Sequence, residues 1–284
     1  LNKIKKTNIN IKINEKEFYI PVNLENLKKN ISNSKNYKFI SGGTDLSLEI
    51  TKKRKNLESL IYLGNNDDLK YIKIENNNII IGSATTIEDS LETLNKYYPE
   101  LSKMYLRYGS KQIRNVATIG GNIANASPIG DSAPALIALD SSLLIDGIKP
   151  RIIKLNNFFT GYKKTTLKKN EFIKEIIIPI NKNSKFKCYK ISKRFDDDIS
   201  SIFLAINLKL KNNKITNISI VSGGMAEIPK KAYKTEIFLK RKKFNYSNFI
   251  QAKNYIINDF NPLSDMRASK NYRKKVCQNL LEKF

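Results

Sequence analysis

The sequence predicts an α+β protein made of two domains, the second of which is small and built on an antiparallel sheet. At 284 residues the chain can bury more than one hydrophobic core. Short strand-like runs are interspersed with amphipathic helices, and no internal repeat or low-complexity linker separates the two halves. A new unit begins near residues 182–187, so we place the first domain at residues 17–181 and the second at residues 182–284. Residues 1–16 are assigned to an N-terminal extension or linker.

The first forty residues predict a strand, a helix and a second strand. Residues 8–20 alternate polar and apolar side chains and end at Pro21, which is typical of a strand or of a linker that enters the domain. Asn23 fits the N-cap of a short amphipathic helix over residues 24–31. Residues 37–41 predict a buried strand that runs directly into a double glycine.

The middle of the chain predicts a hairpin, two helices and several short strands. Two apolar segments flank Asn76-Asn77-Asn78, which is a hairpin signal. Thr86 fits the N-cap of a helix over residues 87–98, and Pro99 follows its end. The other elements are a strand at 60–63, a helix at 133–139, a strand at 142–145, an aromatic-rich loop or turn at 155–162 and a strand at 175–179.

The last hundred residues predict three strands followed by helices. The strands are expected at residues 186–191, 202–210 and 215–221, and a polar turn at 211–214 joins the last two. Helices are expected around 235–239, at 246–258 and at the C-terminus. Before the last helix, residues 264–269 contain an N-cap and a local Asp/Arg pair, which we interpret as structural.

The chain is strongly basic, with 51 Lys and Arg residues against 26 Asp and Glu residues and a net charge of +25. Such a charge is compatible with a basic nucleic-acid-binding protein. However, Lys, Asn and Ile are all over-used and share AT-rich codons, so a biased genome gives the same composition. The charges are also spread along the chain rather than gathered in one stripe. We therefore do not expect a nucleic-acid partner and keep that function as a distant alternative.

The chain has no histidine and only two cysteines, Cys188 and Cys277, which form no CxxC motif. These counts exclude zinc fingers, His-based acid–base catalysis and an iron–sulfur cluster that this chain ligates alone, and we expect no metal site. Without a disulfide framework a reducing compartment is favoured, and we expect the cytoplasm. No apolar run reaches about 18 residues, so we expect no membrane-spanning helix. Because the chain begins with Leu1 rather than Met, we expect it to be a portion of something longer.

The first candidate binding motif is the segment at residues 39–46, Phe39-Ile40-Ser41-Gly42-Gly43-Thr44-Asp45-Leu46. A strand that enters a double glycine lets a ligand approach the backbone, and successive N–H groups there form an anion-binding nest. This arrangement suits a pyrophosphate group. A tight turn before an N-capped helix is the alternative. The motif is neither a G-x-G-x-x-G fingerprint nor a P-loop.

The second candidate is the polar block at residues 108–131, which is dense in Gly, Asn, Ser and Thr. Lys111 and Arg114 are its only cations, and it lacks the apolar periodicity of a helix or a strand. We expect a long loop without secondary structure, tied to a core by its isoleucines. Loops of this length are usually functional, and this composition suits a loop whose N–H groups and short side chains face one anionic or polar object. Together the two motifs predict a clamp around a phosphate-bearing cofactor.

A third candidate is the segment at residues 190–199, where a basic run meets Asp196-Asp197-Asp198. It suits a mobile loop beside a charged cofactor. A solvated turn is the alternative, and the spacing of carboxylates does not favour a metal site.

Taken in order, these motifs resemble the FAD-binding part of xanthine dehydrogenase, in its bacterial small-subunit form, and more broadly the flavoproteins of the molybdenum hydroxylase family. The resemblance covers residues 17–284. It implies a two-lobed FAD-binding domain of the vanillyl-alcohol-oxidase (PCMH) type, followed by a C-terminal domain of the CO dehydrogenase flavoprotein type. The matching segments are residues 42–46, 112–131, 158–165, 190–199, 223–232 and 264–269.

The resemblance implies an oxidoreductase component that passes electrons through FAD. In this family a molybdenum-cofactor subunit hydroxylates its substrate, two [2Fe–2S] clusters carry the electrons to FAD, and NAD accepts them. The alternative within the family is the flavin subunit of a carbon monoxide or aromatic dehydrogenase. No catalytic side chain is expected, because the flavin itself performs the redox chemistry. The family's iron–sulfur domain is missing from this chain, so the clusters lie on another chain or have been lost.

The resemblance also assigns cofactor-binding residues. Phe39, Ile40, Ser41, Gly42, Gly43, Thr44, Asp45 and Leu46 would hold the FAD pyrophosphate and its neighbouring groups, while Thr118, Gly121, Asn122, Asn125 and Asp131 would contact the phosphate and adenosine portions. Tyr108 would lie close to the flavin, with Ile173 and Lys190 as further contacts. Animal enzymes have Phe at the position of Tyr108, so its hydroxyl could add a hydrogen bond. Tyr162 would lie on the nicotinamide side, and Asp197 on a mobile loop near the isoalloxazine ring.

Overall fold

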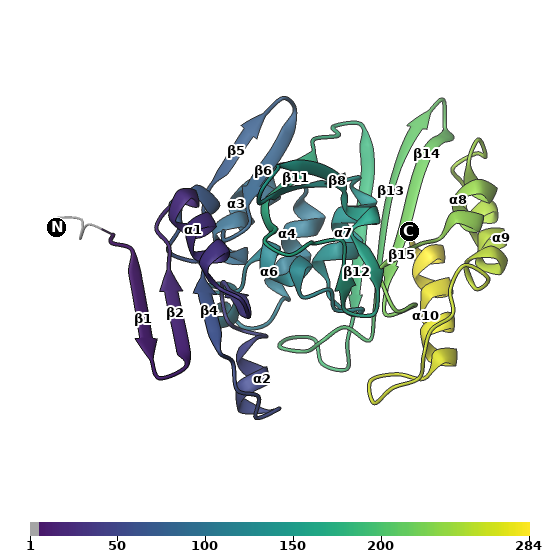
Figure 1. Cartoon of the computed structure of the whole chain (residues 1–284). Helices are drawn as coiled ribbons and strands as arrows, with labels where there is room; N and C mark the ends of the chain where they lie inside the picture. The colour runs from purple at the N-terminus through teal and green to yellow at the C-terminus, as the bar shows by residue number, and fades with distance from the viewer. Residues whose placement is uncertain (1–5) are drawn as a thin grey trace.

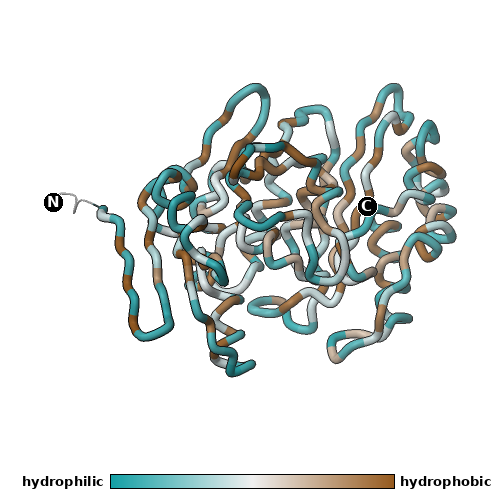
Figure 2. Tube along the Cα trace, viewed as in Figure 1, coloured by the Kyte–Doolittle hydropathy of each residue, from teal (hydrophilic) through white to brown (hydrophobic). Residues whose placement is uncertain are grey.

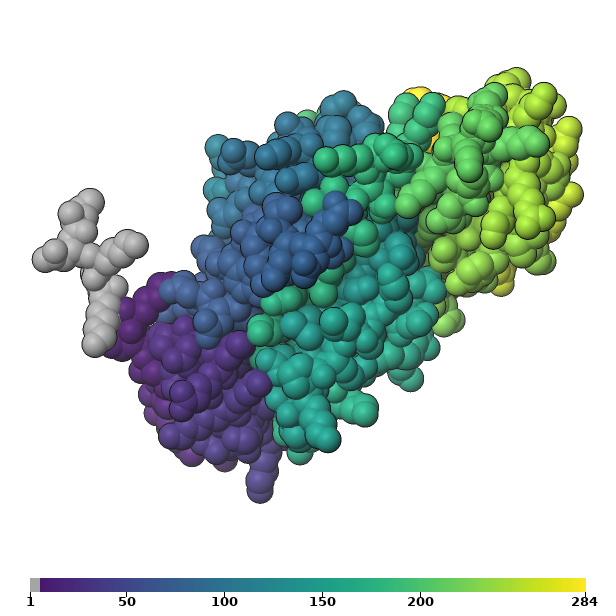
Figure 3. Space-filling view, turned by 90° about the horizontal axis from the view of Figure 1, so that it is seen from above, coloured from purple at the N-terminus to yellow at the C-terminus, as the bar shows by residue number. Residues whose placement is uncertain are grey.

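A computed structural model describes residues 6–284, which form three larger sheets arranged in sequence along the molecule and one two-stranded sheet (Figure 1). The space-filling view shows an elongated shape, with the N-terminal sheet at one end and the C-terminal helices at the other (Figure 3). Hydrophilic residues occupy the tips of the protruding β1–β2 and β5–β6 hairpins (Figure 2). This is the expected two-lobed α+β fold with an antiparallel C-terminal sheet.

The first sheet has four strands in the order β1 (Ile9–Ile13), β2 (Lys16–Ile20), β4 (Ser59–Tyr62) and β3 (Tyr37–Ile40). β4 runs parallel to both β2 and β3, and helix α1 (Leu24–Asn33) packs beside β4. Asn23 caps α1 as predicted, by accepting a hydrogen bond from the backbone N–H of Asn26. Residues 9–13, which we placed in an extension or linker, form β1 and pair with β2 along its whole length.

The second sheet is antiparallel and has the order β5 (Ile72–Glu75), β6 (Asn78–Gly82), β11 (Phe172–Pro179), β7 (Ser142–Asp146) and β8 (Arg151–Lys154). The predicted asparagine hairpin joins β5 to β6, with Asn76 and Asn77 in the left-handed region. Helix α3 (Ile87–Tyr97) begins at the predicted Thr86 cap. The smaller elements are η1 (Asp67–Leu69), η2 (Leu155–Asn157), β9 (Phe159–Gly161), β10 (Lys164–Thr165) and α2 (Ser47–Thr51).

The third sheet has the order β12 (Ser184–Ile191), β13 (Ile202–Lys211), β14 (Lys214–Gly223) and β15 (Lys230–Lys231). Strand β13 is buried on both faces. Phe203 and Ala205 enter the large core of the second sheet, while Leu204 and Ile206 enter a separate core with the C-terminal helices. Successive side chains of a strand point to opposite faces, so one apolar run joins the two cores. The helices are α8 (Tyr233–Leu239), α9 (Tyr246–Ile256) and α10 (Lys270–Lys283).

The segment before α10 contains the predicted cap and ion pair in modified form. Ser269 is the N-cap of α10, and it accepts a hydrogen bond from the backbone N–H of Tyr272. Asp265 forms its ion pair with Arg273, inside α10, at 2.7 Å rather than with its near neighbour in the sequence. The pair therefore ties the preceding loop to the helix.

The polar block at residues 108–131 is not free of secondary structure, as the sequence had suggested. It contains two short helices, α5 (Lys111–Arg114) and α6 (Ile119–Ala124), and is bounded by α4 (Pro99–Leu106) and α7 (Ser132–Ala138). Ser110 caps α5 and Thr118 caps α6, each by accepting a backbone N–H bond in the first turn. The helices are too short to show a clear apolar period, which is why composition suggested a loop.

None of the helices within residues 6–284 combines the length and the hydropathy that a bilayer crossing requires.

Candidate functional site

A cavity of about 810 Å³ lies where β3, α6, β11 and the segment after β12 meet. Its wall includes every residue that the sequence assigned to the cofactor, together with Asp197. Those residues are Phe39, Ile40, Ser41, Gly42, Gly43, Thr44, Asp45, Leu46, Tyr108, Thr118, Gly121, Asn122, Asn125, Asp131, Ile173 and Lys190. Segments separated by more than 150 positions in the chain thus surround one space.

One wall is the turn after β3, residues 41–46, which we call the Gly42 turn. Gly43 has φ +70°, a conformation that glycine adopts without strain, and its carbonyl accepts the N–H of Ser47 at the start of α2. A Cβ atom on Gly42 would lie only 2.0 Å from the carbonyl oxygen of Val116. The backbone of the Gly42 turn therefore contacts the backbone of the polar block directly.

A second part of the wall is the segment at residues 116–122, which includes the first residues of α6 and which we call the Gly120 turn. Thr118 Oγ1 accepts the N–H of Gly121 at 3.0 Å and so shapes the start of α6. A Cβ on Gly120 would lie 2.5 Å from the carbonyl oxygen of Ser83 at the end of β6. Only glycine allows this helix to approach the strand so closely. Both glycine turns are thus fixed by backbone-to-backbone packing.

A buried ion pair forms part of the wall. Lys190 Nζ lies 2.5 Å from Asp131 Oδ2, and the two side chains are only 4% and 5% exposed. Ser200 donates a further hydrogen bond from its hydroxyl to Asp131 Oδ1. Removing two charges from water is costly unless they are paired and hydrogen-bonded, and both conditions hold here. Asp131 and Lys190, which the sequence assigned separately, thus act on the same part of the cavity.

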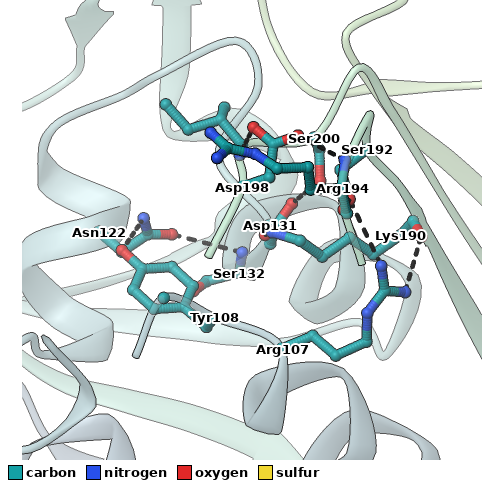
Figure 4. Close-up of polar contacts among 12 residues, drawn as sticks. Arg107, Tyr108, Asn122, Asp131, Ser132, Lys190, Ser192, Arg194, Asp198 and Ser200 are labelled. Atoms are coloured by element: carbon teal, nitrogen blue, oxygen red, sulfur yellow. Dashed lines mark hydrogen bonds and ion pairs between the residues drawn. The ribbon is translucent and has the colours of Figure 1, made fainter. Parts of the chain in front are cut away.

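Tyr108 is held by a short chain of hydrogen bonds (Figure 4). Asn122 donates from Nδ2 to the Tyr108 hydroxyl oxygen at 2.9 Å, and its Oδ1 accepts the backbone N–H of Ser132 at 3.3 Å. The Tyr108 ring also meets the ring of buried Tyr105 edge-to-face, with centroids 6.4 Å apart. Burial raises the pKa of Tyr108 to about 12, so its hydroxyl is protonated at neutral pH.

Arg107 anchors the loop after β12, residues 192–199. Apart from its place next to Tyr108, nothing in the sequence pattern indicates this role. Its guanidinium donates to the carbonyl oxygen of Lys190 at 2.9 Å (Figure 4). Two further bonds reach the carbonyl oxygen of Phe195 at 3.0 and 3.1 Å. It also lies 4.2 Å from the centre of the Phe195 ring. Asp198 accepts the backbone N–H groups of Arg194 and Ile199, and the first of these bonds is the main cause of its lowered pKa.

Tyr162 does not line the cavity, unlike the other residues that the resemblance assigned. Its side chain is 58% exposed, and the neighbouring Lys163 is the residue of the β9–β10 turn that reaches the cavity wall. Lys163 has φ +53°. A tight hairpin turn directs neighbouring side chains differently, and the sequence does not reveal which one faces inward.

Cations gather at another part of the wall, around Glu49. Lys38, Lys53 and Lys55 place their ammonium groups 2.7, 3.3 and 3.4 Å from its carboxylate. The hydrogen bond from Lys38 is the main cause that lowers the pKa of Glu49 to about 2. Lys38, Glu49 and Lys53 all line the cavity, so this end presents a network of paired charges to a ligand.

The cavity fits a large phosphate-bearing cofactor. Its volume lies within the range of about 300–1,000 Å³ that is typical of ligand sites. Ser41 and Ser83 line it with buried hydroxyl oxygens that have no hydrogen-bond partner within residues 6–284, as expected where a ligand completes the bonding. Across the same described residues, no group of three or more Cys, Asp or Glu side chains could hold a metal ion.

Two family models match the chain in succession. Residues 11–181 match the FAD binding domain in molybdopterin dehydrogenase, and residues 187–284 match the CO dehydrogenase flavoprotein C-terminal domain. Among curated relatives, the xanthine dehydrogenase of Emericella nidulans is 33% identical over 81% of this chain, which spans 18% of that protein's length. The xanthine dehydrogenase FAD-binding subunit of Escherichia coli O157:H7 is 28% identical over 87% of this chain and 86% of its own.

The glyceraldehyde dehydrogenase medium chain of Sulfolobus acidocaldarius is 28% identical over 92% of this chain and 93% of its own. Among solved structures, a carbon monoxide dehydrogenase of Hydrogenophaga pseudoflava has a TM-score of 0.89 at 22% identity, with 94% of each chain covered. This last likeness supports the two-lobed fold.

Proposed function

The chain belongs to the family of FAD binding domains in molybdopterin dehydrogenases, and we propose that it is the FAD-binding electron-transfer component of a molybdenum hydroxylase. The observation that carries this proposal is the cavity whose wall is formed by both the Gly42 turn and the Gly120 turn, which contact each other through their backbones. Bound FAD supplies the hydride and single-electron chemistry, and the protein provides its position and electrostatics.

Each part of the wall has a role in this proposal. The N–H groups of the Gly42 turn and the Gly120 turn hold the diphosphate, and the unpartnered hydroxyl of Ser41 supplies a further hydrogen bond. Thr118, Asn122 and Asn125 bind the phosphate and adenosine portions. The Asp131–Lys190 pair provides a fixed dipole at the wall without leaving a net buried charge.

The finer proposal concerns the electron donor and acceptor. We propose that [2Fe–2S] clusters and a molybdenum cofactor lie on other domains or chains, and that electrons leave the flavin to NAD. The Emericella nidulans and Escherichia coli relatives support xanthine as the substrate of the complete enzyme. Asp197 and Tyr162 would lie on the NAD side, with Asp197 on the 192–199 loop at the cavity wall. The two free thiols of the chain favour a cytoplasmic location.

A second candidate is the flavin subunit of a different member of the family. The Sulfolobus acidocaldarius medium chain supports it, because this chain spans 93% of that subunit, compared with 86% of the Escherichia coli xanthine dehydrogenase FAD-binding subunit. The substrate would be chosen by a partner subunit, so the two candidates share one flavin site. We also propose that residues 17–181 and 182–284 form the two domains.

The test is the absorption spectrum of the purified chain, with mass spectrometry of the released cofactor. We expect a yellow protein with close to one FAD per chain, whose flavin bands are bleached by NADH without oxygen. If the chain binds FAD but NADH does not bleach the flavin bands, the proposal of NAD as the acceptor is contradicted and the proposal of FAD binding stands. A colourless protein whose DNA affinity falls steeply with salt would support the nucleic-acid alternative instead.

A further inference from the structure

The hydrogen bonds around Tyr108 have only one possible direction. The backbone N–H of Ser132 can only donate, so the atom of Asn122 that it meets must be the carbonyl oxygen Oδ1. The other end of the amide, Nδ2, then faces Tyr108, and it also can only donate. The Tyr108 oxygen is therefore the acceptor of this bond, and Ser132 and Asn122 are positioning residues for it.

It follows that the hydrogen of the Tyr108 hydroxyl is not used in this contact. Within residues 6–284 the hydroxyl donates no hydrogen bond to another protein group, and the side chain is partly buried. Tyr108 and Asn122 both line the cavity, so their contact lies at its wall (Figure 4). A hydroxyl that keeps a free donor at a cavity wall can donate to a ligand or to water there.

We infer that the Tyr108 hydroxyl donates a hydrogen bond to an acceptor atom of the flavin nucleotide in the cavity. The inference rests on the proposed function, since it takes FAD as the occupant. FAD offers many acceptors, among them the ring carbonyls, ring nitrogens, ribityl hydroxyls and phosphates. A Phe at this position would keep the aromatic contact and lose the donor.

Tyr105 provides a matched control within the same aromatic pair. It is fully buried, its ring packs on Tyr108, and it does not line the cavity. Y105F and Y108F each remove one hydroxyl from a tyrosine of this pair, but only Y108F removes a donor that faces the ligand. Thermal melts of both variants report whether folding itself has changed.

The experiment is a titration of the FAD-free chain with FAD, followed by flavin fluorescence and absorption. We expect Y108F to raise the dissociation constant about three- to tenfold, the value of one hydrogen bond, and Y105F to change it less than twofold. A shift of the visible flavin bands in Y108F identifies a ring atom as the acceptor. An unshifted spectrum identifies the ribityl or phosphate portion.

N122D tests the direction of the bond. Its carboxylate can accept from both the Ser132 N–H and the Tyr108 hydroxyl, which turns the tyrosine hydrogen away from the cavity. Adding Y108F to N122D should then raise the dissociation constant for FAD less than twofold. The comparison is between N122D and the double variant, so the charge that N122D introduces is present in both and cancels. Equal FAD binding by Y108F and the unmodified chain would overturn the inference, as would an undiminished Y108F effect in the N122D background. Failure of the unmodified chain to bind FAD would instead refute the proposed function.

Discussion

Replacement of Gly42 by Ala tests whether contact between the two glycine turns creates the site. The added Cβ would lie 2.0 Å from the carbonyl oxygen of Val116, 2.5 Å from its carbonyl carbon and 2.9 Å from Ala117 Cα. Because Cβ contacts below 3.0 Å are essentially never observed, the turns must separate by about 1 Å. All three neighbours are backbone atoms, so no side-chain rotation relieves the overlap. Overpacking of this kind costs about 1–3 kcal/mol of stability.

Cofactor affinity should fall together with stability. A separation of about 1 Å breaks at least one charge-assisted hydrogen bond to the diphosphate, worth about 2 kcal/mol, which corresponds to a roughly 30-fold rise in the dissociation constant. FAD titration by fluorescence measures it, and a urea melt of the FAD-free protein measures stability. Gly161→Ala is the control, because its Cβ would meet no atom closer than 3.9 Å. A G42A variant that binds FAD as tightly as the G161A variant would refute the reasoning.

Three further predictions concern charged residues around the cavity. Lys190→Met should destabilise the protein by about 3–5 kcal/mol in urea melts, because it leaves the carboxylate of a buried ion pair without its partner; a loss below 1 kcal/mol would contradict this. The folded pKa of Glu49 is about 2, mainly because of Lys38, and lies below its ordinary value of 4.5. The difference in unfolding free energy between the unmodified protein and Glu49→Gln should therefore be constant above pH 4.5 and vanish as the pH falls toward 2. A difference that does not change with pH would argue against the Lys38–Glu49 pair. Arg107→Ala should accelerate trypsin cleavage within the 192–199 loop several-fold, because four hydrogen bonds to this region are lost, and unchanged cleavage would show that the loop is held otherwise.

The sequence predicted both glycine turns because their signals are local. A strand that enters Gly42-Gly43 and a Gly/Asn-rich block each suggest a backbone that approaches a ligand. The contact between Gly42 and Val116 could not be predicted, because it depends on how distant segments pack. The same holds for the pairing of Asp131 with Lys190, which lie 59 positions apart.

The sequence was less informative where a helix is very short, where a strand is exposed on both faces, and where a side chain lies in a turn. Ser110 and Thr118 are ordinary helix caps, but the helices that follow have only 4 and 6 residues, too few to reveal an apolar period. The strand at Ile9–Ile13 has only exposed residues, so its alternation fitted a linker equally well. Tyr162 lies in a turn, where the direction of a side chain depends on backbone angles that sequence alone leaves open, and its place on the NAD side stays a prediction.

The most direct test is a crystal structure of the chain with bound FAD. The account predicts that the diphosphate lies between the Gly42 turn and the Gly120 turn and accepts backbone N–H groups from both. A flavin bound elsewhere, or a diphosphate that contacts neither turn, would contradict it.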